Sequence, residues 1–222
     1  YTGDGGTCPR DDCNDLDPAI GFSCGDPAPE QAAWGSLWTV EHNIGIGGWT
    51  WPLVEMGSSG LPVIAHFDGS KNERDLVFLQ CTAANCSTAL RRPILHANNA
   101  GNFPSLAIRQ NGNPILAHLN LTDRFLEVFD CNDPGCVTGT NRVLDAATGY
   151  WGFDTSTVIR SDGRPIIAYW HSDSQDLRVY DCGDSACSTG TVRTLDSFEQ
   201  TGYAPSIVIG EDAAPLISYG KA

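Results

Sequence analysis

Residues 112–136 read GNPILAHLNLTDRFLEVFDCNDPGC, and similar stretches occur elsewhere in the chain. Residues 163–187 read GRPIIAYWHSDSQDLRVYDCGDSAC, and residues 60–86 read GLPVIAHFDGSKNERDLVFLQCTAANC. A fourth copy starts at residue 214 with APLISYGKA, where the sequence ends. The copies are spaced by 52, 51 and 50 residues when they are aligned on a shared proline, which is Pro62, Pro114, Pro165 and Pro215. Spacing this regular indicates a repeat architecture.

Each copy contains four short segments with the pattern of β-strands. In the copy quoted first they are residues 104–110, 114–119, 126–131 and 142–145, which read PSLAIRQ, PILAHL, LEVFDC and RVLD. Turn residues separate the segments, and no helical period occurs. Four-stranded units of about 50 residues are typical of the blades of a β-propeller. We therefore predict an all-β fold, a four-bladed β-propeller, with a solenoid as the alternative.

The two ends of the chain complement each other. The last copy, residues 205–222, has only its first two strands, whereas AIGFSC at residues 19–24 resembles LRVYDC in the third copy. GSLWTVE at residues 35–41 similarly resembles GTVRTLD. We predict that residues 19–41 complete the blade that residues 205–222 begin, which removes the open sheet edges. Residues 19–222 would then form one propeller domain, after an acidic segment at residues 1–18.

Composition limits the classes of partner. The chain has 222 residues, of which 41% are hydrophobic, enough for one globular unit. Its formal net charge of −14 disfavours nucleic acid and anionic membranes as partners and is compatible with cation binding. The sequence has no apolar run long enough to span a membrane and starts with Tyr1, so we expect a processed or excised chain.

Eight of the nine cysteines form four pairs with the spacing C-x4-C, namely Cys8/Cys13, Cys81/Cys86, Cys131/Cys136 and Cys182/Cys187. We predict that these pairs are disulfides, formed in an oxidising compartment, so that the protein is secreted or on the cell surface. The alternative is a thiolate metal site. Cys24 is the odd cysteine, and it is either a buried thiol or part of a set with Cys8 and Cys13.

The five histidines, His42, His66, His96, His118 and His171, fall in or beside the loops that would share one face of a propeller. His66 and His118 occupy the same repeat position, where the other blades carry Tyr169 and Tyr219. Imidazole is a common ligand of copper, zinc and nickel, so the two histidines are a candidate metal-binding pair. The alternative is that these side chains form hydrogen bonds between blades.

An acidic, glycine-rich stretch near the N-terminus is a second candidate metal site. Carboxylates at alternating spacing suit calcium, which takes six to eight oxygen ligands. We predict calcium binding by oxygen-bearing side chains of residues 4–17: Asp4, Asp12, Asn14, Asp15 and Asp17. The alternative is a solvated acidic terminus.

The stretch DDCNDLDPAI at residues 11–20 resembles the short metal-binding motif named after the MopE-type copper-binding proteins of methanotrophs. The matching residues are Asp12, Cys13, Asp15, Asp17 and Pro18, while Asn14 replaces an aspartate. The resemblance implies a secreted protein that holds Cu(I) with two histidines and an oxidised tryptophan. In this chain it implies His66 and His118 as ligands, with His42, His96, His171, Trp49, Trp51 and Trp170 as further candidates. No tryptophan lies two residues before a histidine, which departs from the family pattern.

Three classes of function follow from these features. The first is a copper scavenger or carrier, which the histidine pair favours, and the second is a glycan- or protein-binding propeller, which the aromatic loops favour. The third is a polysaccharide-active enzyme, but acidic residues such as Asp68, Asp154 and Asp173 lack a recognisable catalytic spacing. Because no nucleophile or metalloprotease motif is present either, we expect a binding protein rather than an enzyme.

Overall fold

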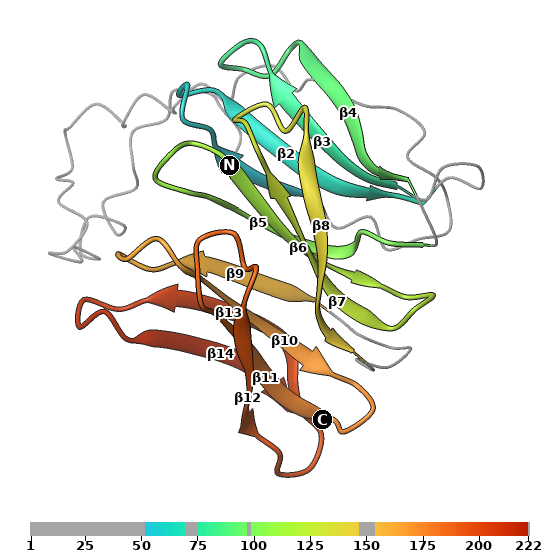
Figure 1. Cartoon of the computed structure of the whole chain (residues 1–222), viewed down its shortest axis with the longest axis vertical. Helices are drawn as coiled ribbons and strands as arrows, with labels where there is room; N and C mark the ends of the chain where they lie inside the picture. Colours follow the sequence, from blue (N-terminus) through green and yellow to red (C-terminus); the bar gives the residue numbers. More distant parts are fainter. Residues whose placement is uncertain (1–51, 70–74, 97–98, 147–153, 222) are drawn as a thin grey trace, which may run out of the picture. The chain divides into compact units, whose positions relative to one another are not determined.

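The computed structural model describes residues 52–69, 75–96, 99–146 and 154–221 (Figure 1). The chain divides into two compact units, Tyr1–Leu37 and Trp38–Ala222, and every described residue belongs to the second. Within these described ranges each regular element is a β-strand. They include no helix long and apolar enough to cross a membrane.

The strands form three four-stranded antiparallel sheets and one two-stranded sheet. The first sheet contains β1 (Leu53–Met56), β2 (Pro62–Asp68), β3 (Asp75–Cys81) and β4 (Ala89–His96). The second contains β5 (Asn102–Ile108), β6 (Pro114–Asn120), β7 (Phe125–Cys131) and β8 (Gly139–Ala146). The third contains β9 (Thr155–Ile159), β10 (Pro165–His171), β11 (Asp176–Cys182) and β12 (Gly190–Asp196). The fourth pairs β13 (Thr201–Ile209) with β14 (Pro215–Lys221).

Each repeat is therefore one sheet, with its strands in sequence order, as predicted for the blades of a β-propeller. The pairing register also repeats: Ile115 lies opposite Asp130 in the second sheet, and Ile166 lies opposite Asp181 in the third. The predicted completion of the fourth blade by residues 19–41 lies outside the described residues.

The core lies between consecutive sheets, because side chains alternate between the two faces of each strand. Val63, Ala65 and Phe78 of the first sheet pack against Leu106, Leu116 and Phe129 of the second. Ile115, Ala117 and Val128 of the second sheet pack in the same way against Ile167, Tyr169 and Tyr180 of the third. Ile166, Ala168 and Val179 of the third sheet pack against Ile207, Ile209 and Ile217 of the fourth.

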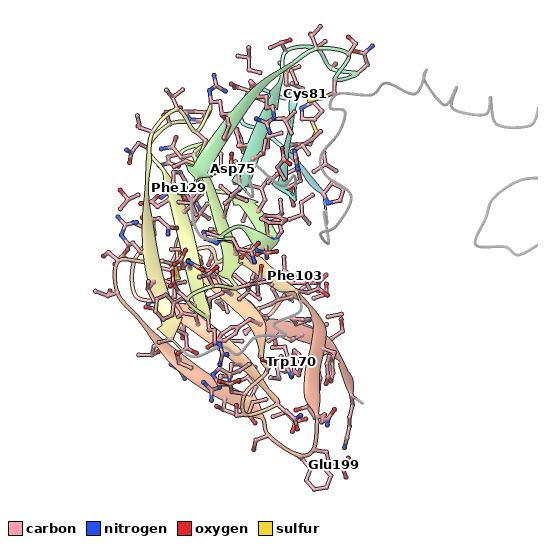
Figure 2. The ribbon with its side chains drawn as sticks, turned by 90° about the vertical axis from the view of Figure 1, so that its right-hand side faces the viewer. Asp75, Cys81, Phe103, Phe129, Trp170 and Glu199 are labelled. Atoms are coloured by element: carbon pink, nitrogen blue, oxygen red, sulfur yellow. A yellow bond between two sulfur atoms is a disulfide. The ribbon has the colours of Figure 1, made fainter. Side chains whose placement is uncertain are left out.

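Three of the four predicted disulfides are present: Cys81–Cys86, Cys131–Cys136 and Cys182–Cys187. Figure 2 labels Cys81 beside the first of them. Each joins the end of a third strand to the turn that follows, and the second cysteine of each pair has a positive φ of 51 to 53°. The disulfide therefore holds a conformation that a non-glycine residue adopts only rarely. Cys8, Cys13 and Cys24 lie outside the described part of the chain.

Candidate functional site

The strand-two position shared by His66, His118, Tyr169 and Tyr219 connects neighbouring blades where it holds a tyrosine. The Tyr169 hydroxyl donates to Oδ2 of Asp145 at 2.5 Å, and the Tyr219 hydroxyl donates to Oδ2 of Asp196 at 2.8 Å. Asp145 lies on β8 and Asp196 on β12, which are the last strands of the preceding blades. Burial, and then the hydrogen bond to Asp145, raises the pKa of Tyr169 well above its ordinary value, so its hydroxyl keeps the proton that it donates.

His118 fills the same position with a different set of partners, because its preceding blade has Leu95 in place of the aspartate. The side chain is fully buried, its Nδ1 accepts from the Gly101 amide at 3.1 Å, and its Nε2 lies 3.1 Å from Oδ1 of Asn141. The proton therefore sits on Nε2. Burial lowers the pKa of His118 and outweighs the opposite effect of Glu127. Both ring nitrogens of a neutral imidazole are thus engaged in hydrogen bonds.

The structure does not bring His66 and His118 together. Ala65 faces the second sheet, where it packs in a cluster with Leu116, so its neighbour His66 points from the other face of β2. His118 shares a face with Leu116 and points toward the first sheet. The strands of the first sheet therefore lie between the two imidazoles. The described residues also hold no group of three or more His, Cys, Asp or Glu side chains suited to a metal ion.

Most of the other predicted ligands lie outside the described residues. They are His42, Trp49 and Trp51 for copper, and Asp4, Asp12, Asn14, Asp15 and Asp17 for calcium. The backbone of His96 pairs with Asp75 at the end of β4. The copper and calcium sites therefore stay predictions.

His171 belongs to a polar cluster at the β10–β11 hairpin, on the predicted loop face. Its Nδ1 lies 2.8 Å from Oγ of Ser174, which donates to Oδ2 of Asp176 at 2.5 Å. Arg178 donates to the same Oγ at 3.1 Å and to Oδ2 of Asp145 at 3.4 Å. Burial and the nearby Arg178 charge lower the pKa of His171, which favours the neutral ring. The cluster thus carries donors and acceptors within hydrogen-bond reach of one another.

Trp170, labelled in Figure 2, lies on the opposite face of β10 from His171. The indole is buried, and its ring centroid is 4.2 Å from that of Tyr203, with the two planes inclined by 33°. Tyr203 is only partly buried, and its hydroxyl donates to Oε1 of Gln200 at 3.1 Å. Trp170 thus supports an aromatic ring that reaches the surface at the start of β13.

The loop-face ends of the first strands share an unusual backbone conformation. Phe103, Asp154 and Ala204 occupy equivalent positions, and their φ angles are 49, 58 and 45°. Non-glycine residues adopt this region rarely, and it is enriched at functional sites. Of the three, Asp154 alone carries a carboxyl group, and burial raises the pKa of that group above its ordinary value. Sequence spacing did not distinguish Asp154, but its repeat position directly before a first strand is a usable signal.

Asp154 and Tyr203 lie at the same end of neighbouring strands. The Ile207 amide on β13 donates to Oγ of Ser156 on β9 at 3.2 Å, so the two first strands are side by side. Asp154 is equivalent to Ala204, the residue after Tyr203. Asp154 and Tyr203 are therefore at about the same height along the two neighbouring strands. A carboxyl group and a partly exposed aromatic ring at the same end of neighbouring strands suit a ligand with both hydroxyl groups and an apolar face.

No protein-family model and no curated protein sequence matches the chain. Solved structures do match, among them a protein of unknown function from Dyadobacter fermentans DSM 18053, with 19% identity and a TM-score of 0.57 over 75% of this chain. An endo-1,4-beta-xylanase from Bacteroides thetaiotaomicron VPI-5482 has 12% identity and a TM-score of 0.50 over 75% of this chain and 64% of its own.

An α-L-arabinofuranosidase from Clostridium thermocellum ATCC 27405 has 16% identity and a TM-score of 0.50 over 77% of this chain and 67% of its own. The chain spans about half the length of the Dyadobacter protein, since 47% of that protein is covered. At these identities the similarity concerns the fold, and it agrees with the β-propeller that the four sheets form.

Proposed function

We propose that this chain is a glycan-binding β-propeller module of a secreted or cell-surface protein, and that the glycan binds on the loop face over β9 and β13. The observation that carries the proposal is that the half-buried Asp154 carboxyl and the partly exposed Tyr203 ring lie at the same ends of β9 and β13, two strands joined by the hydrogen bond from Ile207 to Ser156. Aromatic rings stack on the apolar faces of sugars, while a carboxyl group forms hydrogen bonds with their hydroxyls. The Trp170 indole beneath Tyr203 holds the ring in place at 4.2 Å between centroids.

Two further observations support this proposal. Solved structures with a similar fold include a xylanase and an arabinofuranosidase, which are named for carbohydrate substrates. The three disulfides fit a protein that folds in an oxidising compartment, where extracellular glycans are met. The formal net charge of −14 disfavours acidic polysaccharides, so the best-matched ligand class is a neutral oligosaccharide.

Calorimetric titration of the full chain with neutral xylo- and arabino-oligosaccharides tests the proposal. We expect Tyr203→Ala and Asp154→Asn each to weaken binding about tenfold or more, because each removes a contact worth about 1.4 kcal/mol or more. Asp162→Asn is the matched control, since Asp162 is an exposed aspartate in the turn between β9 and β10. Binding that is unchanged in both site variants would place the ligand elsewhere.

Hydrolysis of the bound glycan is a second candidate function, which the raised pKa of Asp154 favours because a general acid must keep its proton. Release of reducing ends from the same oligosaccharides separates the two candidates. An enzyme loses turnover in Asp154→Asn while Tyr203→Ala mainly weakens binding, whereas a binding module releases no reducing ends at all.

The predicted copper and calcium sites do not involve Asp154 or Tyr203. Elemental analysis of protein purified without added metal tests both metal sites. One copper per chain that is lost in both His66→Ala and His118→Ala would support the scavenger. Calcium alone, lost on replacement of Asp15 and Asp17, would support an N-terminal calcium loop in a binding module.

A further inference from the structure

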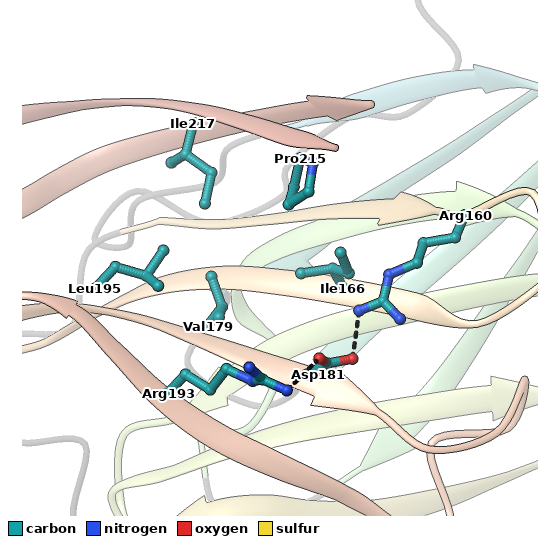
Figure 3. A pocket seen from close by; sticks show the side chains of 8 residues that line it. All are labelled: Arg160, Ile166, Val179, Asp181, Arg193, Leu195, Pro215 and Ile217. Atoms are coloured by element: carbon teal, nitrogen blue, oxygen red, sulfur yellow. Dashed lines mark hydrogen bonds and ion pairs between the residues drawn. The ribbon is translucent and has the colours of Figure 1, made fainter. Parts of the chain in front are cut away.

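The third sheet carries an open pocket of about 320 Å³ on the face that is turned toward β14 (Figure 3). Ile166, Val179 and Leu195 of the third sheet form one side of the pocket, and Pro215 and Ile217 of β14 form the other. Leu195, on the outermost strand β12, is 51% exposed, whereas its equivalent Leu144 in the second blade is partly buried against the next blade. The pocket therefore exposes apolar surface that a partner segment can bury.

The equivalent faces of the first two sheets are covered by the next blade. In the second sheet, Ile115, Val128 and Leu144 belong to one apolar cluster with Tyr180, Cys182 and Cys187. In the first sheet, Val63, Phe78 and Ile94 belong to a cluster with Phe129, Cys131 and Cys136. In both cases the covering groups are the aromatic residue of the next third strand and the disulfide turn after it. The pocket marks the place where the fourth blade should supply the same groups.

The charged end of the pocket repeats the same arrangement. In the second sheet, Asp130 forms ion pairs with Arg109 at 2.7 Å and Arg142 at 3.1 Å. The two arginines also donate to carbonyl oxygens of the next disulfide turn, those of Ser185 at 3.3 Å and Ala186 at 3.2 Å.

In the third sheet, Asp181 forms ion pairs with Arg160 and Arg193 in the same way (Figure 3). The third sheet thus carries the arginines that would contact a turn of the next blade. Within the described residues, the fourth blade contributes β13 and β14 and no such turn.

An aromatic ring and a glycine are paired in the covering segments. A Cβ atom added to Gly139 would lie 2.3 Å from Cε1 of Phe129, and one added to Gly190 would lie 2.3 Å from Cε1 of Tyr180. The ring therefore requires glycine at the start of the fourth strand. In the first blade, Leu79 takes the place of the aromatic residue, and Ala89 takes the place of the glycine. Ring and glycine are thus present or absent together.

We propose that residues 19–24 fill this pocket as the third strand of the fourth blade, with the Phe22 ring packed between β14 and the apolar face of the third sheet. In AIGFSC, Phe22 falls at the position of Phe129 and Tyr180. Residues 35–41 begin with Gly35 at the position of Gly139 and Gly190, so the ring and the glycine are again present together. The docking is independent of the proposed glycan site, which lies at the loop ends of β9 and β13.

The register of the other blades fixes how this strand meets β14. The second and third strands pair Val63 with Gln80, Ile115 with Asp130 and Ile166 with Asp181. The same register pairs Leu216 with Ser23 and Ser218 with Gly21. The outer edge of β14, whose hydrogen-bonding groups would otherwise be open to another chain, then becomes an interior strand.

A double-mutant cycle tests the ring and the glycine in the full chain. We expect Gly35→Ala to lower Tm by about 5 °C, because its Cβ would collide with the Phe22 ring. Adding Phe22→Leu recreates the pair Leu79 and Ala89 of the first blade, so at least half of the loss should return. Ser36→Ala, at the next residue, is the control and should leave Tm unchanged. Losses that simply add in the double variant would overturn the placement of Phe22.

Disulfide trapping tests the register directly. Under mild oxidation, the variant Ser218→Cys with Gly21→Cys should form an intramolecular disulfide in the monomer, located by peptide mapping. The control Ser218→Cys with Ile20→Cys is one residue out of register, points its thiols to opposite faces, and should stay reduced. Absence of the cross-link in the first variant would overturn the proposal. A cross-linked dimer would also overturn it, because a second copy would then fill the pocket.

Discussion

At the scale of single residues, the strand-two position shows how one side chain is adapted to its neighbour in the preceding blade. Tyr169 and Tyr219 occur where that blade ends in an aspartate, and His118 occurs where it ends in Leu95. The tyrosine hydroxyls donate to the aspartate carboxylates, whereas the His118 imidazole accepts a hydrogen bond from the Gly101 amide. At Tyr169 and Tyr219 the position thus forms hydrogen bonds between blades, which was the alternative to metal binding that the sequence left open, whereas His118 bonds to Asn141 of its own blade and to the Gly101 amide.

The first prediction concerns the Tyr169 hydroxyl. Tyr169→Phe should lower the free energy of unfolding by about 1–3 kcal/mol, because it removes the short hydrogen bond to the largely buried Asp145 carboxylate and leaves only the longer contact from Arg178 at 3.4 Å. Urea unfolding followed by tryptophan fluorescence measures the change. Tyr203→Phe is the control, since its hydroxyl bonds only to Gln200 at an exposed site, and it should cost about 0.5 kcal/mol or less. Equal losses in the two variants would contradict the special role of the Tyr169 hydrogen bond.

The second prediction concerns the pH dependence of Asp154. Because burial raises the pKa of this carboxyl, its neutral form stabilises the fold at low pH, and that stability is lost as pH rises through the folded value. Asp154→Asn keeps a neutral side chain at every pH. It should therefore raise Tm at pH 7 by roughly 1–3 °C and leave Tm nearly unchanged at pH 3.

Asp162→Asn is the control for this pH series. The hydrogen bond from the Arg164 side chain lowers the pKa of Asp162, so its ionised form is the stabilising one. Its replacement should not raise Tm at any pH. An increase for Asp154→Asn that is as large at pH 3 as at pH 7 would contradict burial of the Asp154 charge.

At the scale of elements, spacing predicted the strands well. Alternation and turn residues placed the four strands of each copy, and the C-x4-C spacing placed three disulfides at the turn after each third strand. Spacing could not show that His66 and His118 point to different sides of the first sheet. Equivalent side chains in a repeat each face the sheet that precedes their own. The first sheet therefore lies between the His66 and His118 side chains. The positive φ of Asp154 could not be read from its residue type, and only its repeat position before β9 marks it.

The third prediction concerns the disulfide turns. Replacing Cys131 and Cys136 by alanine should cost about 2 kcal/mol of unfolding free energy, since a loop this short restricts the unfolded chain only modestly. The turn keeps a second support, because Asp133 accepts from the amides of Gly135 and Val137 at 3.0 and 3.1 Å. Chemical unfolding of the double variant measures the loss. The double variant at Cys182 and Cys187 should lose about the same free energy. Loss of the folded state in either double variant would show that the aspartate hydrogen bonds alone do not hold the turn.

At the scale of the whole molecule, four of the exposed apolar residues occupy first-strand and second-strand positions of the first and fourth blades. Val54 and Met56 on β1 are 65 and 58% exposed, and Val208 and Leu216 in the fourth blade are 53 and 67% exposed. Leu106, the equivalent of Val54, is 5% exposed, and Ile115, the equivalent of Leu216, is fully buried. In a propeller that closes, the fourth blade faces the first. These four residues are then expected to form a fourth apolar interface between blades.

The fourth prediction tests this closure with a charge. Leu216→Lys should lower the free energy of unfolding by about 2–4 kcal/mol, because it loses apolar burial and places an ammonium group between two sheets. Val143→Lys is the control, because Val143 is 53% exposed on β8, the outermost strand of its blade, and should change stability by about 0.5 kcal/mol or less. Met56→Lys, on the opposite side of the expected interface, should resemble Leu216→Lys. If all three variants unfold like the parent in urea, the first and fourth blades do not meet, and the exposed apolar residues require a separate partner chain.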